Sequence, residues 1–186
     1  MPLLETRASA SAQGYGLFGA TASTGNFFLI QQLSPSAVST VTFSSIPATY
    51  KSLQVRFNIV AASAGQIAKV QLNGDSGTNY ATHYLTGSGS AASAGGSASN
   101  NYLQMFNAGV GTVITYPSVG IVDILDYANT NKNKTMKAFI GNNQNTSAGT
   151  AEITSAVWLS TAAVTSLSFL LQGANFTGTI SLYGVS

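Results

Sequence analysis

Residues 120–137 read GIVDILDYANTNKNKTMK, and this stretch predicts a buried β-strand that leads into a polar hairpin. The apolar run contains Asp123 and Asp126, and an Asn-rich turn with three lysines follows it. Five of the chain's twelve charged residues lie here. These side chains form either a reactive centre or the polar edge of a β-scaffold, and the remainder of the sequence decides between the two.

The composition favours a protein that packs against other protein surfaces. The charged fraction of the 186 residues is 6%, compared with about 25% in an average soluble protein. Ser, Thr, Asn, Gly and Ala take the place of the missing charges, and such a surface is poorly protected by self-repulsion. We therefore expect contacts with copies of the chain or with a larger assembly; the alternative is a secreted β-protein with a neutral polar coat.

Several classes of partner and site are disfavoured. The net charge is only +2 and the basic residues are scattered, so no nucleic-acid partner is expected. No segment approaches the roughly 18 apolar residues of a membrane span, and residues 1–7 do not resemble a secretion signal. The absence of cysteine excludes disulfides and thiolate metal sites.

Alternating patterns predict an all-β fold over residues 37–186. In the clearest of them, Leu53, Val55, Phe57 and Ile59 alternate with polar residues. Asn73-Gly74 is a strong hairpin signal. The Gly/Ser/Ala-rich residues 87–101 predict a flexible surface loop. Further strands are expected near residues 38–43, 68–72, 102–106, 110–116, 119–127, 135–141, 151–160, 164–171 and 178–184.

Residues 1–36 differ from the remainder of the chain because they lack sustained periodicity. Residues 14–19 read GYGLFG, but a nucleotide-binding loop requires a preceding strand and a following helix, and neither is predicted. We interpret the segment as an extended N-terminal arm whose aromatic side chains dock on a partner: Tyr15, Phe18, Phe27 and Phe28. The alternative is a loosely ordered N-terminal strand of the same domain.

The residues needed for catalysis or for a resident cofactor are sparse, so no catalytic, cofactor-binding or metal-binding residues are predicted. Asp123 and Asp126 are three apart in a strand and project to opposite faces, which separates them as an acid/base pair. His83 is the only histidine and has no nucleophile elbow to accompany it. Asp75 offers one carboxylate to a calcium ion, although an Asx-type turn explains it better.

Two other surface roles stay open. Amphipathic rings stack on sugars or lie at subunit interfaces, and Tyr80, Tyr84 and Trp158 are the candidates for either role. Trp158 is expected on the face opposite to that of Val157 and Leu159. The lysines that follow residue 131 are interpreted as a solvated hairpin end, or as a contact with an acidic partner.

Four segments together resemble a group of tailed-bacteriophage virion proteins. They are FSSIPATYKSLQVR (residues 43–56), LNGDSGTNY (72–80), DILDYANTNKNKT (123–135) and SLYGV (181–185). The resemblance covers residues 37–186, and the Ala/Ser/Gly-rich opening is similar to N-terminal segments of phage structural proteins. It implies a jelly-roll-like antiparallel β-sandwich, of the kind found in capsid decoration proteins and tail fibres, and a homotrimer.

Together these observations predict a non-enzymatic decoration (cement) protein on the outside of a phage particle, in contact with itself and with the major capsid protein or other virion proteins. Two alternatives remain: a tail-fibre or spike module that recognises host surface polysaccharide, and a glycan depolymerase, which the scarcity of paired carboxylates disfavours. Residues 121–127 are then a scaffold strand, with an exposed turn after it.

Overall fold

The computed structural model describes residues 26–143, 145 and 149–186, and within these residues every regular element is a strand. The larger sheet contains, in spatial order, β1 (Phe27–Leu33), β12 (Phe176–Val185), β3 (Ser52–Ala61), β8 (Ser118–Leu125), β9 (Lys134–Asn143), β10 (Gly149–Trp158), β5 (Tyr80–Gly87) and β6 (Ala92–Asn100). The smaller sheet contains β2 (Thr40–Phe43), β11 (Leu167–Leu171), β4 (Gln66–Leu72) and β7 (Leu103–Val110). No helix in the described part has the length and hydropathy needed to cross a bilayer.

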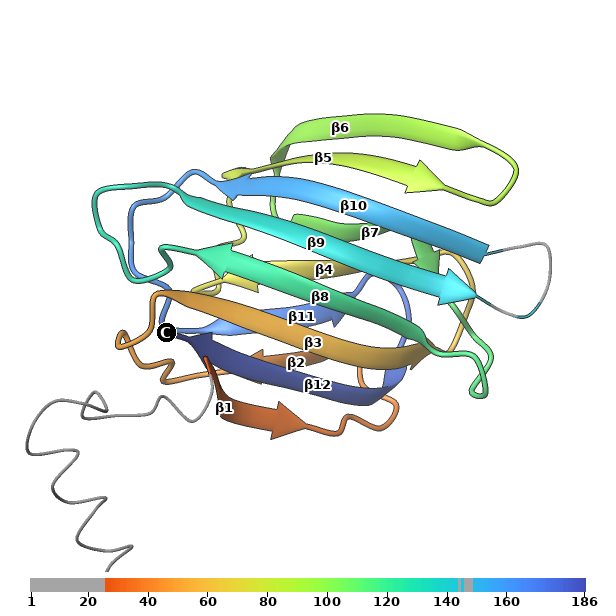
Figure 1. Cartoon of the computed structure of the whole chain (residues 1–186), viewed down its shortest axis with the longest axis horizontal. Coiled ribbons are helices and arrows are strands. Elements are labelled where there is room, and N and C mark those ends of the chain that lie inside the picture. The colour runs from red at the N-terminus through yellow and green to blue at the C-terminus, as the bar shows by residue number, and fades with distance from the viewer. Residues whose placement is uncertain (1–25, 144, 146–148) are drawn as a thin grey trace, which may run out of the picture.

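Eight of the strands form a jelly roll. The order β1-β12-β3-β8 is one of its layers, and β2-β11-β4-β7 is the other (Figure 1). Along the chain, the connections β1 to β2, β2 to β3 and β3 to β4 each cross between the layers. In the second half, β7 to β8 and β11 to β12 also cross, and so does the path from β8 to β11 when the two strands inserted between them are left aside. This double Greek-key order confirms the predicted all-β, jelly-roll-like antiparallel sandwich.

The remaining four strands extend only the larger sheet. β9 and β10 are inserted between β8 and β11, and β5 and β6 between β4 and β7. The sheet therefore continues past β8 through β9, β10 and β5 to β6, which is the edge strand opposite to β1 (Figure 1). This extension makes the outer face of the larger sheet the broadest regular surface of the described molecule.

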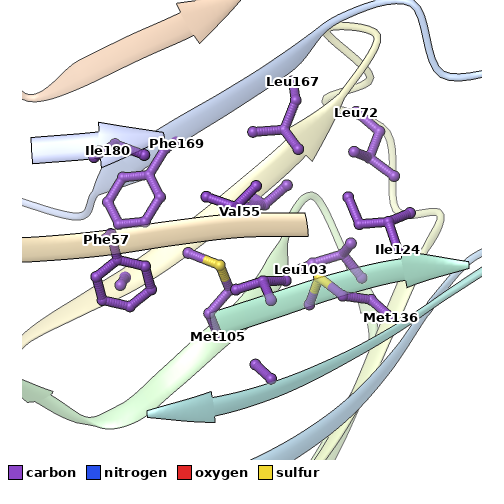
Figure 2. Packing of buried hydrophobic residues seen from close by; sticks show 14 of the residues in the cluster. Val55, Phe57, Leu72, Leu103, Met105, Ile124, Met136, Leu167, Phe169 and Ile180 are labelled. Carbon is purple, nitrogen blue, oxygen red and sulfur yellow. The ribbon is translucent and has the colours of Figure 1, made fainter. Parts of the chain in front are cut away.

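One hydrophobic core lies between the two sheets. Alternate side chains of β3 and β12 point inward and meet the side chains of β11, as Figure 2 shows for Phe57, Phe169 and Ile180. The rings of Phe57 and Phe169 pack edge to face with centroids 5.2 Å apart. Burying a single side chain of this size contributes about 1.5–3 kcal/mol. A shift of one residue would turn all the inward side chains outward, so the alternation predicted for residues 53–59 sets which face of the strand is buried.

The N-terminal boundary of the sandwich lies earlier than predicted. β1 pairs with β12, with Phe27 opposite Val185 and Leu33 opposite Ile180. Residues 26–36 thus belong to the sandwich domain, as the alternative interpretation had it, instead of to an arm that ends at residue 36. The periodicity was obscured because a bulge between Leu29 and Gln31 shifts the alternation. The predicted anchors Tyr15 and Phe18 lie outside the described residues.

Two other predictions are wrong. Residues 87–101 do not form a flexible loop, because β6 pairs with β5 along this segment through backbone hydrogen bonds that need no large side chains. No strand covers residues 111–116, where one was predicted, because β7 ends at Val110. The amide of Tyr116 instead donates to the carbonyl oxygen of Val113 and closes a turn. The β-branched residues of that turn are instead exposed.

Candidate interaction surface

Apolar side chains form a continuous row across the outer face of the larger sheet. The strand registers place Ile121 of β8 opposite Phe139 of β9, Phe139 opposite Ile153 of β10, and Ile153 opposite Leu85 of β5. Their exposed fractions are 44%, 60%, 57% and 54%, in the order of the row. With strands about 4.8 Å apart, the row spans roughly 14 Å. Val119 and Leu125 add exposed apolar surface on β8.

This row is unusual for the solvated face of an antiparallel sheet, where polar residues are expected to alternate with buried apolar ones. The inner positions of the same strands are already apolar: Val122 and Ile124 on β8 and Ile140 on β9 are buried. β8 is therefore apolar on both faces. A contiguous apolar patch, unlike single exposed hydrophobic residues, is typical of an interaction surface.

A polar cluster borders the row on its β3 side. Gln54 donates from Nε2 to Asp123 Oδ1 at 2.7 Å, and Lys137 Nζ lies 3.4 Å from Asp123 Oδ2. Arg56 donates from Nε to Gln54 Oε1 at 2.6 Å. Gln54, Asp123 and Lys137 line a hollow of about 420 Å³ together with the apolar side chains of Ile121, Phe139 and Ile153. The outer face thus combines an apolar row with fixed donors and acceptors.

Phe27 and Phe28 are held by the sandwich itself. The Arg56 guanidinium lies between two rings, 4.6 Å from the centroid of Phe27 and 4.7 Å from that of Tyr183. The ring of Phe28 stacks on Tyr50 with centroids 5.7 Å apart. Both phenylalanines remain partly exposed. Their contacts anchor β1 at the edge of the sheet, so these two residues do not belong to a free arm.

Tyr80 and Trp158 are buried. This corrects the assignment of Tyr80 as a surface aromatic, and for Trp158 it decides between the two positions that the sequence left open, the interior of the sandwich and a subunit interface, in favour of the interior. Their rings stack with centroids 6.2 Å apart in the core. The indole N–H of Trp158 donates to Asp75 Oδ2 at 2.6 Å, and the Tyr80 hydroxyl donates to the Asp75 carbonyl oxygen at 3.0 Å. Burial raises the pKa of Tyr80 to about 12. Neither ring offers a face to a sugar, although Trp158 does lie on the face opposite Val157 as predicted.

Asp75 is the acceptor of a closed turn. Besides the Trp158 indole, its carboxylate accepts from the amide of Gly77 at 2.8 Å and from Asn79 Nδ2 at 3.0 Å. The hydrogen bond from Trp158, followed by that from Asn79, lowers the pKa of Asp75 from its ordinary value. Its oxygens are thus occupied by donors of the protein, as the Asx-turn interpretation requires. Among the described residues no group of three His, Cys, Asp or Glu is arranged to hold a metal ion.

His83 and Tyr84 lie on opposite faces of β5. His83 points to the outer face, where the register places Ser155 directly opposite it. Asp123 occupies the same row, but β9 and β10 lie between its strand and His83, at a separation of roughly 14 Å. Ser155 is thus the cross-strand neighbour of His83, while the carboxylate that would orient the histidine is paired with Lys137. Tyr84 is half-buried on the inner side.

Sequence reasoning missed three buried charged side chains of the described residues, Glu152, Lys134 and Lys69. Glu152 accepts hydrogen bonds from the hydroxyls of Thr86 and Thr154, at 2.8 and 3.2 Å, and from the amide of Asn107 at 2.8 Å, which ties β10 and β5 to β7. Its position in an alternating strand, in phase with Thr154 and the inward Trp158, was a usable signal.

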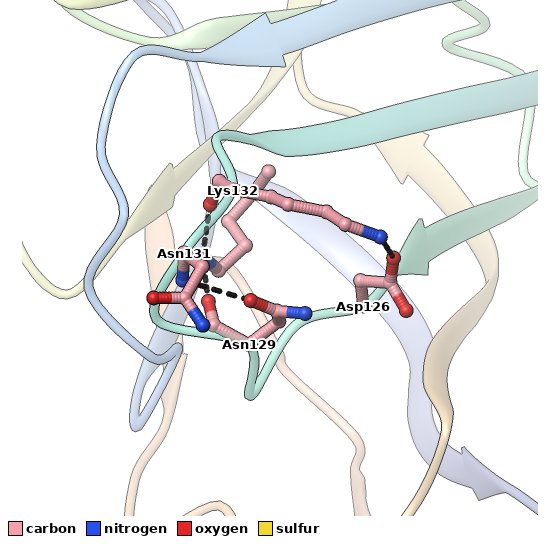
Figure 3. A network of polar contacts seen from close by, with 5 residues as sticks. Asp126, Asn129, Asn131 and Lys132 are labelled. Carbon is pink, nitrogen blue, oxygen red and sulfur yellow. Dashed lines mark hydrogen bonds and ion pairs between the residues drawn. The ribbon is translucent and has the colours of Figure 1, made fainter.

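Lys134 is the second buried charge, and it corrects the predicted solvated hairpin end. Its Nζ donates to the carbonyl oxygens of Asn129, Lys132 and Thr161 at 2.5, 2.7 and 3.1 Å. Burial lowers the pKa of Lys134. Lys132 does remain in solvent and pairs with Asp126 at 3.0 Å, while Asn129 accepts from the amide of Asn131 (Figure 3).

The apolar row was also missed, although the sequence contains a signal for it. Ile121-Val122 and Ile124-Leu125 are adjacent apolar pairs, and Phe139-Ile140 is another. Such pairs place one apolar side chain on each face of a strand. A comparison of the chain with models of known protein families and with characterised proteins found no match.

Proposed function

We propose that this protein is a non-enzymatic structural component of a tailed-phage virion, a decoration (cement) protein that binds the outer surface of the head as a homo-oligomer. The phage assignment rests on the resemblance of the four segments described above. The observation that carries the structural role is the apolar row from Ile121 to Leu85, which needs a covering surface. The major capsid protein is the proposed partner.

The carboxylates support a structural role. Each acidic residue of the described part has a structural contact: Asp75 holds a turn, Asp123 and Asp126 pair with lysines, and Glu152 joins the sheets. A general acid or base needs a carboxylate that is free to reach a substrate. The low charge of the chain also suits a surface that is covered in an assembly.

The test is a binding assay with purified protein and capsids that lack it. Phe139→Ser combined with Ile153→Ser replaces the two most exposed members of the row, and we expect capsid binding, measured by co-sedimentation, to be lost. The matched control is Ile114→Ser, an apolar residue of 70% exposure outside the sheet, which should bind like the unmodified protein. A folded double variant that binds at full occupancy would contradict the proposal.

Deletion of residues 1–25 tests the remaining part of the arm, including Tyr15 and Phe18. It leaves β1 intact, so the sandwich should unfold at an unchanged temperature while capsid occupancy falls. Undiminished occupancy after this deletion would show that the arm is not the anchor. The mass of the unmodified protein in solution tests the expected trimer.

A second candidate, recognition of host surface polysaccharide, is favoured by one observation. The exposed ring of Phe139 borders the same hollow as Gln54, Asp123 and Lys137, and an aromatic face beside amide and charged groups suits a pyranose. A glycan array separates the candidates, because Phe139→Ala should abolish a glycan signal if this hollow binds sugar. The absence of any glycan signal would leave the decoration role.

A further inference from the structure

The free edge of the larger sheet, β6, is exposed along almost its entire length. Its residues are Ala92–Asn100, with the sequence ASAGGSASN, and nearly all of them are exposed on both faces. In Figure 1 it is the outermost strand and has β5 as its only neighbour in the sheet. A strand with so little buried side-chain surface gains its order almost entirely from backbone pairing on one side.

The two glycines of β6 are explained by the side chains of β5. A Cβ atom on Gly95 would lie 2.5 Å from the Tyr84 hydroxyl oxygen, and a Cβ atom on Gly96 would lie 2.5 Å from a ring carbon of His83. The two β5 rings therefore fold over the glycines, one on each face of the strand. This cover leaves the outer backbone edge of β6 unobstructed.

The β6 edge also lacks most of the features that usually protect an edge strand. Such features are charged side chains, proline, short length and bulges. β6 has no charged residue or proline. Its register with β5 runs without a shift from Ala92 to Ser97, and its one irregularity lies at the end of the strand, between Ser97 and Asn100. The other free edges differ: β2 has four residues, and both β1 and β7 have register shifts in the middle of their pairings.

We propose that β6 pairs antiparallel with β6 of a second copy of this chain, which joins the two larger sheets into one. The two-fold axis of such a pair is normal to the sheet, so the outer face of one copy continues into the outer face of the other. A two-fold contact of this kind uses the same strand twice and joins copies in pairs, so it predicts an even number of copies in solution instead of the three that the resemblance implies. The pairing goes beyond the proposed function, because it concerns how copies join each other and not what their outer face binds.

The apolar row gives this pairing a consequence for the surface. Leu85 stands opposite Ala94 in the register of β5 and β6, so the row ends on β6 with a small apolar side chain. Across the two-fold axis, the row of the second copy continues in the opposite direction. The two rows then form one apolar surface about twice as long. Side chains no larger than Ser and Asn offer no steric barrier to the approach of the strands.

Charge complementation in the full chain tests the pairing. Ala94→Lys with Ala98→Lys places two lysines on the exposed strand β6, where the like charges of the two copies would repel each other on pairing. This variant, and the matching Ala94→Glu with Ala98→Glu, should each sediment as a folded species of half the mass of the unmodified oligomer. An equimolar mixture should regain the mass of the unmodified oligomer at low salt.

The control places the same two charges elsewhere: Val113→Lys with Ile114→Lys, in the exposed turn between β7 and β8, should leave the mass unchanged. Circular dichroism confirms that each variant is folded. The proposal is overturned if the β6 lysine variant keeps the mass of the unmodified protein, if the unmodified protein is a monomer or a trimer, or if the mixture does not re-associate.

Cross-linking gives a second, independent measurement, because the chain contains no cysteine. Single cysteines at Ser93, Ala94, Ser97 and Ala98 form a disulfide between copies only where the Cα atoms approach within about 7 Å. We expect a cross-linked dimer for the positions nearest the axis and none for Ile114→Cys. The absence of a cross-link at all four positions would contradict the pairing.

Discussion

Trp158 connects the core of the sandwich to a surface turn through a single hydrogen bond. Its ring is buried against Tyr80, and its N–H reaches the carboxylate of Asp75, which also closes the turn through Gly77 and Asn79. A hydrogen bond to a charged acceptor contributes about 1.5–3 kcal/mol. At the residue scale, Asp75 is therefore a structural side chain whose charge state affects the folded protein.

Asp75→Asn should lower the free energy of unfolding at pH 7 by about 2 kcal/mol, since the amide is a weaker acceptor than the carboxylate. The pKa of Asp75 is lower in the folded protein than its ordinary value of 3.8. The carboxylate thus stabilises the fold above that value, and its contribution is lost as the pH falls through the folded pKa. Urea titrations should show the difference between variant and unmodified protein shrinking below pH 3.8.

Asp126→Asn is the matched control for this measurement. Asp126 pairs with Lys132 in solvent, and exposed pairs contribute about 0–1 kcal/mol. If Asp126→Asn lowers the free energy of unfolding as much as Asp75→Asn does, the hydrogen bond from Trp158 to Asp75 makes no specific contribution to stability.

Lys134→Met should destabilise the protein by about 3 kcal/mol, measured by chemical unfolding. The ammonium group satisfies three carbonyl oxygens of the segments around it, and methionine would leave them without this donor. Lys137→Met, on the exposed face of the same strand, is the comparison and should change stability by less than about 1 kcal/mol. Equal effects of the two substitutions would contradict the structural role of Lys134.

At the scale of single elements, strands with strict alternation were predictable and strands with other determinants were not. β3 was located because Leu53, Val55 and Phe57 alternate with polar residues. β6 was predicted as a loop, since its order comes from pairing with β5 and not from buried side chains. The exposed row was missed for a related reason: the pairing of β8, β9, β10 and β5 is a long-range property, and single strands do not reveal which exposed residues become neighbours.

Gly95→Val tests how β6 is held against β5. The new side chain would collide with the ring of Tyr84, so we expect β6 to detach locally while the core stays folded. Amide hydrogen exchange should accelerate in β6, about tenfold for each 1.4 kcal/mol of local stability lost. Ala94→Val is the control, because residue 94 is exposed. Faster exchange throughout the molecule would instead mean that β6 unfolds together with the core.

At the scale of the whole molecule, one core spans both sheets and includes residues of both insertions. Met136 of β9 and Tyr80 of β5 belong to the two insertions, yet they are buried in the same cluster as Val55 of the jelly roll. The extension of the larger sheet is therefore part of the folding unit. Because its outer face is not needed for this core, that face is available for contacts with other molecules.

A single cooperative unfolding transition should result from this shared core. Trp158, the only tryptophan, reports on the β10 and β5 side by fluorescence, while far-ultraviolet circular dichroism reports on all strands. The two signals should give coincident urea curves. Refolding is expected in milliseconds to seconds, as for other folds dominated by non-local strand pairs. Separate transitions for the two signals would contradict the single unit.

The position of β12 between β1 and β3 also constrains how the protein is made in a cell. β12 is the last strand in the sequence, and both of its neighbours are synthesised much earlier. At about 5–20 residues per second, β1 leaves the ribosome on the order of ten seconds before β12. During this time β12 is missing, so β1 and the edge of β3 that pairs with β12 in the folded protein have no partner strand. A nascent chain interrupted before residue 176 would therefore expose unpaired strands to chaperones and proteases, so only chains extended through β12 escape this control.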